Sequence, residues 1–215
     1  TYPELLDELA TYFIEHGYRF KALHRVLLNA NAYQLAAHTE GRPGGTDPLE
    51  KLLFARYEPR KLPAEVLMDA VTQVTGVPFE FDGYPVGMSP KELVDSIGAP
   101  YFLTTFGFPS RDVMEAREEG PSLAQALHLM NGEGIADKVT KEDNVLGELL
   151  TGPASDREIV EALYLRAFAK LPSEGQWSAI RHYLDQETGA GRSRRRALEG
   201  VLWAILNSKE FQLNQ

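Results

Sequence analysis

The end of the chain carries the clearest pattern of apolar and polar positions. Its apolar side chains recur at the i, i+3, i+4, i+7 and i+8 spacing that places them on one face of an α-helix. These residues are Leu198, Val201, Leu202, Ile205 and Leu206. Asn207 and Ser208 interrupt the pattern, so the sequence predicts a buried helix that ends there. Leu202→Ala is expected to cost about 2–5 kcal/mol of stability, and Arg195→Ala no more than about 0.5 kcal/mol.

Helical spacing occurs along most of the chain, and several stretches begin with a helix-capping signal. In each signal a Ser, Thr or Asp precedes a Glu or Gln by three residues, so both side chains can accept hydrogen bonds from free backbone N–H groups. The pairs are Thr1 with Glu4, Asp47 with Glu50, Ser89 with Glu92, Ser155 with Glu158 and Ser173 with Gln176. We expect helices to begin at these places, and about nine helices in all.

Two stretches lack the helical spacing of apolar residues. Thr39 to Pro48 is rich in glycine and proline and predicts a surface loop. Gly76 to Ser89 places Val77, Phe79 and Phe81 at period two among glycines and prolines, which indicates an extended excursion or a lone hairpin that covers the helices.

The predicted fold is therefore all-α. It is an irregular multi-helix bundle of about nine helices with one short extended excursion around residues 76–89. Gly152 and Pro153 indicate a joint before the last three predicted helices. We expect an N-terminal helical subdomain over residues 1–150, with a three-helix subdomain over 151–215 packed on it as one compact unit.

Composition limits the classes of function. The 215 residues are 43% hydrophobic, and no apolar run approaches the ~20 residues that cross a bilayer. Lys plus Arg number 22 and Asp plus Glu 31, a net charge of −9 that disfavours nucleic-acid binding. With no cysteine, disulfides, thiolate nucleophiles, Cys-ligated zinc and thioether-attached haem are excluded within this sequence. The start, Thr1, has no signal-peptide pattern, so the sequence reads as a piece of a longer protein.

Residues that could carry chemistry do not form a recognised constellation. None of the five histidines forms a His-x-x-x-His pair, and His24 is expected to be a packed histidine with a hydrogen-bonded nitrogen. Gly132 to Asp137 has no preceding strand and predicts a helix corner instead of a dinucleotide site. The acidic groups at Asp156, Glu158 and Glu161 read as a solvated face. The basic run from Arg192 to Arg196 reads as an exposed contact patch.

Seven phrases along the chain resemble a planctomycete family of C-terminal domains of unknown function. They run from Pro3 to Ala10, Phe20 to Asn29, Arg60 to Val71, Phe106 to Arg111, Gln125 to Gly132, Leu163 to Phe168 and Trp203 to Phe211. Such domains resemble the C-terminal part of larger exported planctomycete and verrucomicrobial proteins, which implies a c-type cytochrome module and a further planctomycete-specific domain upstream. The resemblance also implies a periplasmic or cell-surface location, those upstream domains as partners, and a glycan as an alternative partner.

One segment departs from the family pattern. Many members are expected to carry a cysteine-containing stretch before an arginine, but Val113 to Arg117 has no cysteine, so a thiol or metal role is not expected here. Arg117, Gln125 and Asn131 do match the family motif. They either cap helix ends from the inside or line an interaction groove together with Trp203.

We therefore expect a non-catalytic binding or scaffolding domain of an envelope protein, in preference to an enzyme. No catalytic residue, metal ligand or cofactor is predicted. The alternative is a component of an oxidoreductase or electron-transfer system, or of a polysaccharide-processing system. A haem-attachment motif upstream would favour electron transfer, and carbohydrate-binding modules would favour glycan processing.

Overall fold

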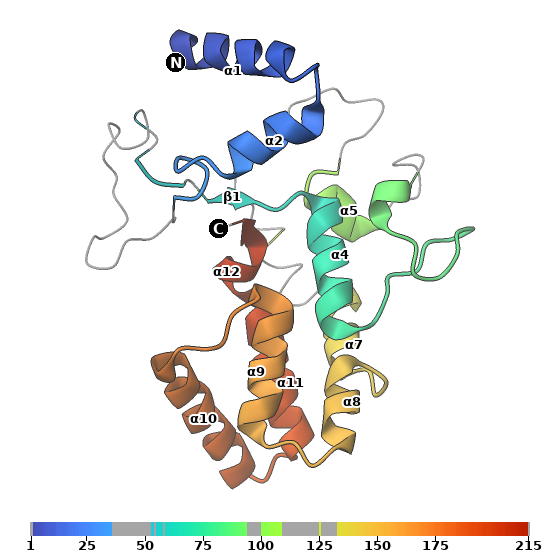
Figure 1. Cartoon of the computed structure of the whole chain (residues 1–215). Helices are drawn as coiled ribbons and strands as arrows, with labels where there is room; N and C mark the ends of the chain where they lie inside the picture. Colours follow the sequence, from blue (N-terminus) through green and yellow to red (C-terminus); the bar gives the residue numbers. More distant parts are fainter. Residues whose placement is uncertain are drawn as a thin grey trace. The chain divides into compact units, whose positions relative to one another are not determined.

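The structure is a computed structural model that describes residues 2–35, 53, 55–57, 59–93, 100–108, 125 and 133–214 (Figure 1). It divides into two compact units, Thr1–Arg60 with Gln215, and Lys61–Asn214. Helices make up nearly all the regular structure of the described residues, which confirms the all-α prediction. Thr39 to Pro48 and the signal at Asp47 lie outside the described residues.

The described residues of the first unit form α1 (Pro3–Glu15) and α2 (Phe20–Leu28). Pro3 opens α1, where its missing N–H costs nothing, while Thr1 lies outside the described residues. Gly17 and Tyr18, both with positive φ, reverse the chain between the helices. The Phe13 ring then lies 5.1 Å from the Phe20 ring across the reversal. Neither helix contains a buried residue.

The second unit contains the core and most of the helices. Its elements are β1 (Arg60–Lys61), whose second residue starts the unit, α4 (Ala64–Thr75), the 3₁₀ turn η1 (Pro90–Glu92), α5 (Tyr101–Thr105), α7 (Glu133–Thr140), α8 (Val145–Thr151), α9 (Asp156–Phe168), α10 (Glu174–Gly189), α11 (Arg194–Asn207), α12 (Lys209–Gln212) and β2 (Leu213–Asn214). Helix α11 is central, since α7, α8, α9, α10 and α12 all pack on it (Figure 1).

The predicted apolar face of α11 is confirmed. All five residues of the stripe are buried, and Leu202 is fully inaccessible. The helix ends at Asn207 as expected, and Ser208 then caps α12 by accepting a hydrogen bond from the backbone N–H of Phe211. The stripe packs in one core with apolar residues of α4, α7, α8 and α9.

The capping signals have different outcomes. Ser155 and Ser173 form complete capping boxes with Glu158 and Gln176 at the starts of α9 and α10. A helix also begins at Ser89 as expected, but it is only the three-residue 3₁₀ turn η1, in which Ser89 accepts a hydrogen bond from the N–H of Lys91. Ser89 also donates to a carboxylate oxygen of Asp69 in α4, a contact that the local pattern could not predict.

The excursion at residues 76–89 is present and irregular. Gly76 ends α4 in the left-handed conformation, and Val77 and Phe81 are buried. Two turns follow, closed by the N–H groups of Tyr84 and Met88, and no strand lies within this stretch. The excursion is therefore not a hairpin. The described strands are instead β1 and β2, which pair with each other and were not predicted.

Helices on both sides of residue 150 share the core of the second unit. Helices α4 and α7 lie before this point and pack on α9 and α11, respectively, and α8, which ends at Thr151, packs on both α9 and α11. The division between the compact units falls at Arg60 and Lys61 instead. A subdomain boundary near residue 150 stays a prediction.

Candidate functional site

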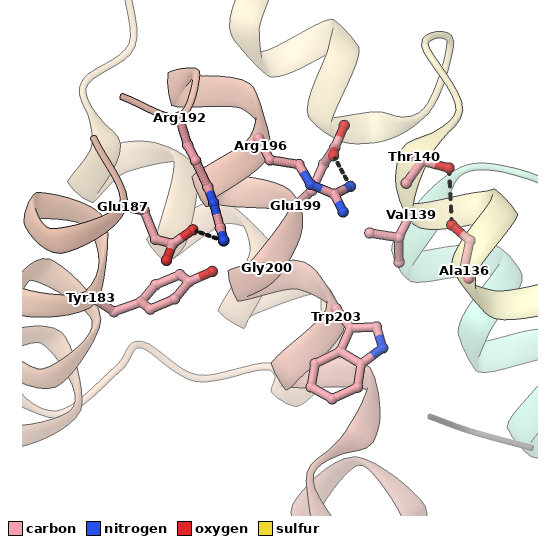
Figure 2. Close-up of a pocket in the computed structure, with 10 residues that line it drawn as sticks. All are labelled: Ala136, Val139, Thr140, Tyr183, Glu187, Arg192, Arg196, Glu199, Gly200 and Trp203. Atoms are coloured by element: carbon pink, nitrogen blue, oxygen red, sulfur yellow. Dashed lines mark hydrogen bonds and ion pairs between the residues drawn. The ribbon is translucent and has the colours of Figure 1, made fainter. Parts of the chain in front are cut away.

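A pocket of about 290 Å³ lies in the second unit between α7, α10 and α11 (Figure 2). It is lined by Ala136, Val139, Thr140, Tyr183, Glu187, Arg192, Arg196, Glu199, Gly200 and Trp203. Figure 2 shows Tyr183 and Glu187 of α10 on one side, the α11 residues in the middle and the α7 residues opposite. Concave sites where aromatic and polar groups converge are the usual places for ligands.

Gly200 allows α10 and α11 to approach closely at the pocket. A Cβ atom at this position would lie 2.1 Å from the hydroxyl oxygen of Tyr183. The Tyr183 ring therefore packs directly on the α11 backbone and forms one wall of the pocket. Burial, followed by the charge of Glu187, raises the pKa of the Tyr183 hydroxyl, while Arg192 and Arg196 oppose the increase. The hydroxyl is thus neutral at physiological pH.

The charged residues of the pocket form ion pairs. Arg192 donates a hydrogen bond to Glu187, and Arg196 donates one to Glu199 at 3.1 Å (Figure 2). Glu199 also accepts from Arg195 at 3.0 Å. The Arg192 and Arg196 side chains are 60% and 62% exposed, whereas those of Glu187 and Glu199 are 18% and 8% exposed. The cations therefore face solvent and the carboxylates lie beneath them.

Helix α7 supplies the opposite wall and is held by Lys138. The Lys138 ammonium donates to the carbonyl oxygens of Val77 at 2.9 Å and Pro78 at 2.6 Å, and it lies 3.8 Å from the centre of the Phe79 ring. Burial and, to a smaller extent, the charge of Lys141 lower the pKa of Lys138 to about 8, against the opposing effect of Glu80 and Asp137. This residue ties α7 to the excursion.

Lys138 was not predicted as a site residue, although its position in the apolar pattern of α7 offered a signal. Ile135 and Val139 are buried on α7, and Lys138 falls beside Val139 and one turn after Ile135. A lysine at an inward helical position needs hydrogen-bond acceptors, because a buried charge is costly without them. The acceptors come from residues about sixty positions away, which the sequence does not identify.

The structure places the predicted groove residues in different settings. Trp203 lines the pocket. Gln125 accepts a hydrogen bond from Lys61 at 2.9 Å and donates one to the carbonyl oxygen of Thr105 at 3.1 Å. Arg117 and Asn131 lie outside the described residues. A groove shared by all four residues stays a prediction.

The basic run is not a free contact patch. Arg194 binds Asp156 and the carbonyl oxygen of Ala154, and Arg195 binds Glu199 and the carbonyl oxygen of Lys141. With the pairs of Arg192 and Arg196 described above, these contacts fasten the start of α11 to neighbouring elements. The run therefore has a structural role that the sequence alone did not indicate.

The other candidates also have local structural partners. Glu158 belongs to its capping box, and the hydrogen bond from the Ser155 backbone N–H lowers the pKa of its carboxyl group. Glu161 pairs with Arg157 on α9. His24 has the expected hydrogen-bonded nitrogen, next to the carbonyl oxygen of Phe20, but it is exposed and not packed.

Among the residues that the structure describes, no group of three or more His, Asp or Glu side chains is placed to hold a metal ion. No described helix has the length and apolar character needed to cross a membrane.

Comparison with known proteins gives one family match. Residues 1–93 match the model of a family described as "PSD1: Protein of unknown function (DUF1553)". No curated protein and no solved structure matches the chain. The matched residues include α1, α2, α4 and the excursion, and the pocket residues lie beyond them. Over these residues, the chain is similar to a family whose function is unknown.

Proposed function

We propose that this chain is a non-catalytic binding domain of a larger envelope protein and that it binds its ligand in the pocket between α7, α10 and α11. The observation that carries this proposal is the arrangement of polar groups in the pocket. Exposed guanidinium groups lie beside Tyr183 and Trp203, and both carboxylates are already engaged by arginines. The pocket thus offers hydrogen-bond donors and aromatic surface to a ligand.

The same arrangement disfavours acid–base catalysis. A general base must be able to take a proton from its substrate, with a pKa near the working pH. Glu187 and Glu199 each already accept a hydrogen bond from a guanidinium group, so both carboxylates are engaged within the protein. The raised pKa of Tyr183 keeps its hydroxyl protonated. These groups are therefore better suited to binding a ligand than to catalysing its conversion.

The setting of this domain rests on the resemblance described above, and the family match over residues 1–93 covers part of the chain that carries it. We include in the proposal an exported polypeptide with a c-type cytochrome module upstream, located in the periplasm or at the cell surface. An antibody raised against this chain tests it by immunoblotting of cell fractions. In the envelope fraction we expect a band of higher molecular mass than a 215-residue chain, and we expect this band to stain for covalent haem. A cytoplasmic band without haem would refute this setting.

Binding can be tested with the two tryptophans as internal reporters. Trp203 lines the pocket, whereas Trp177 lies on α10 with Arg157 5.5 Å from its ring centre and is not a pocket residue. Their indole N–H groups give separate signals in a ¹H–¹⁵N correlation spectrum. We expect some members of a fragment library of neutral, cationic and anionic compounds to shift the Trp203 signal and leave the Trp177 signal in place.

Whether the protein converts the bound fragments tests the proposal that the domain is non-catalytic. Mass spectrometry should recover each fragment unchanged after prolonged incubation with the protein. A product that forms with the parent protein and not with Tyr183→Phe would contradict a purely binding role. If no fragment of any charge moves the Trp203 signal, the pocket is not a binding site and the proposed function fails.

A further inference from the structure

We propose that the pocket selects a small organic anion, a carboxylate carried on a six-membered ring. This inference rests on the proposed binding function and adds the chemical class of the ligand. The carboxylate would meet the guanidinium groups of Arg192 and Arg196, and the ring would lie against Trp203. Three observations support this class: the exposure of the charges, the remaining hydrogen-bond donors, and the lining and volume of the pocket.

The exposed charge of the pocket is positive although the chain is acidic. The two arginine side chains are more than half exposed, and the carboxylates that they contact are mostly buried. Arg195 is a second cationic partner of Glu199. A ligand approaching from solvent therefore meets guanidinium groups first. Because the whole chain carries −9, non-specific attraction of anions is weak, and anion binding would report this local arrangement.

Both arginines have further N–H groups that can donate hydrogen bonds to a ligand. A guanidinium group carries five N–H donors in a planar fork that suits two carboxylate oxygens. Within the part of the chain that the structure describes, Arg192 uses its Nη1 on Glu187, and Arg196 uses its Nη1 on Glu199. The Tyr183 hydroxyl adds another donor, and its raised pKa keeps its proton in place.

The rest of the lining suits a compact, partly apolar body. Trp203 offers an aromatic ring, and Ala136 and Val139 of α7 offer aliphatic surface across the pocket (Figure 2). A volume of about 290 Å³ is at the small end of known ligand pockets, so it suits one ring and not an extended chain. Both aromatic rings and the flat faces of sugar rings pack on indole.

The ligand class can be tested with matched probes on the full chain. Benzoate and D-glucuronate carry a carboxylate on an aromatic ring and on a sugar ring, and benzamide and D-glucose are their neutral counterparts. Acetate has the carboxylate without a ring. We expect at least one ring carboxylate to shift the Trp203 indole signal, with affinity about tenfold or more above that of its neutral counterpart and of acetate. The stronger of the two indicates whether the natural ligand is aromatic or a sugar acid.

Arg196→Gln provides the decisive variant. It removes one pocket charge but leaves Glu199 paired with Arg195, so the fold should persist. We expect this change to weaken the ring carboxylate about tenfold or more. Arg181→Gln is the control: it removes the same charge from a 71% exposed side chain on α10 outside the pocket, and binding should not change. Unchanged peak dispersion and thermal midpoints verify that both variants are folded.

The outcomes separate this inference from the proposed function. Equal binding of charged and neutral rings, or equal effects of Arg196→Gln and Arg181→Gln, would overturn the ligand class. If neutral or cationic fragments bind at Trp203 while both ring carboxylates fail, the binding domain stands and the class is wrong. If no compound binds there, both proposals fail.

Discussion

The close approach of Gly200 to Tyr183 gives a sharp test of the pocket geometry. In Gly200→Ala the new Cβ would lie 2.1 Å from the Tyr183 hydroxyl oxygen, so the ring must move. Overpacking of this kind costs about 1–3 kcal/mol, and the better helix propensity of alanine offsets about 0.5–1 kcal/mol. We expect a net loss of about 1–2 kcal/mol in the free energy of unfolding.

A second substitution shows whether the hydroxyl causes this loss. Tyr183→Phe removes the closest atom and leaves the ring carbon that bore it, at 3.0 Å from the new Cβ. A neighbour at that distance must shift by only a few tenths of an ångström. Gly200→Ala should therefore cost little in the Tyr183→Phe protein, and the two changes should be coupled by about 1 kcal/mol or more.

Urea titration of the parent, both single variants and the double variant measures this coupling, with the m-value as the check on two-state unfolding. Gly175→Ala is the matched control, since Gly175 lies in α10 and a methyl group there would have no atom within 4 Å, so stability should stay equal or rise. A Gly200→Ala protein as stable as the parent, or additive effects, would show that Tyr183 does not pack on α11 in this way.

Three other predictions concern the core, a backbone contact and a buried charge. Leu202→Ala should lower the free energy of unfolding by about 2–5 kcal/mol, because it leaves a cavity in the core. Arg195→Ala should lower it by about 1–3 kcal/mol, more than the sequence suggested, because Arg195 binds the buried Glu199 and the carbonyl oxygen of Lys141. Denaturant titration compares the two variants. Gly147→Ala should cost about 3 kcal/mol or more, since its Cβ would lie 2.0 Å from the backbone oxygen of Glu142, which cannot move aside as a side chain can. With a pKa of about 8 when folded and 10.5 when unfolded, Lys138 binds its proton more tightly in the unfolded chain, so stability should rise by up to about 3 kcal/mol as the pH increases from about 8 to 10.5. Below about pH 8 both states are protonated, and this contribution should no longer change with pH. Lys138→Met should remove this slope in urea titrations at several pH values, and an equal slope in both proteins would contradict the assignment.

Local sequence signals predicted much of the second unit. The stripe on α11 and the capping boxes at Ser155 and Ser173 depend on residues within two turns of each other, so spacing alone identifies them. The Ser89 signal has the same spacing and gives only a 3₁₀ turn. There the Ser89 hydroxyl also binds Asp69 on another element, and such tertiary contacts override a local preference.

The candidate site was much less predictable, because its contacts join distant residues. Trp203 was the one pocket residue singled out from the sequence as lining a groove. The pairing of Arg194 with Asp156 spans thirty-eight positions, and that of Arg195 with the Lys141 carbonyl spans fifty-four. Charge patterns along one helix cannot reveal these partners, so the basic run resembled an unpaired surface patch.

Helix α11 explains why the pocket is suited to binding. One side of the helix carries the buried stripe around Leu202, which fixes it in the core. The neighbouring side carries Arg196, Gly200 and Trp203 at i, i+4 and i+7, so these residues share a face by the pocket. The guanidinium group and the indole are thus held on an element that is ordered without a ligand. A pre-organised site loses little entropy on binding, so a small pocket can select its ligand by charge.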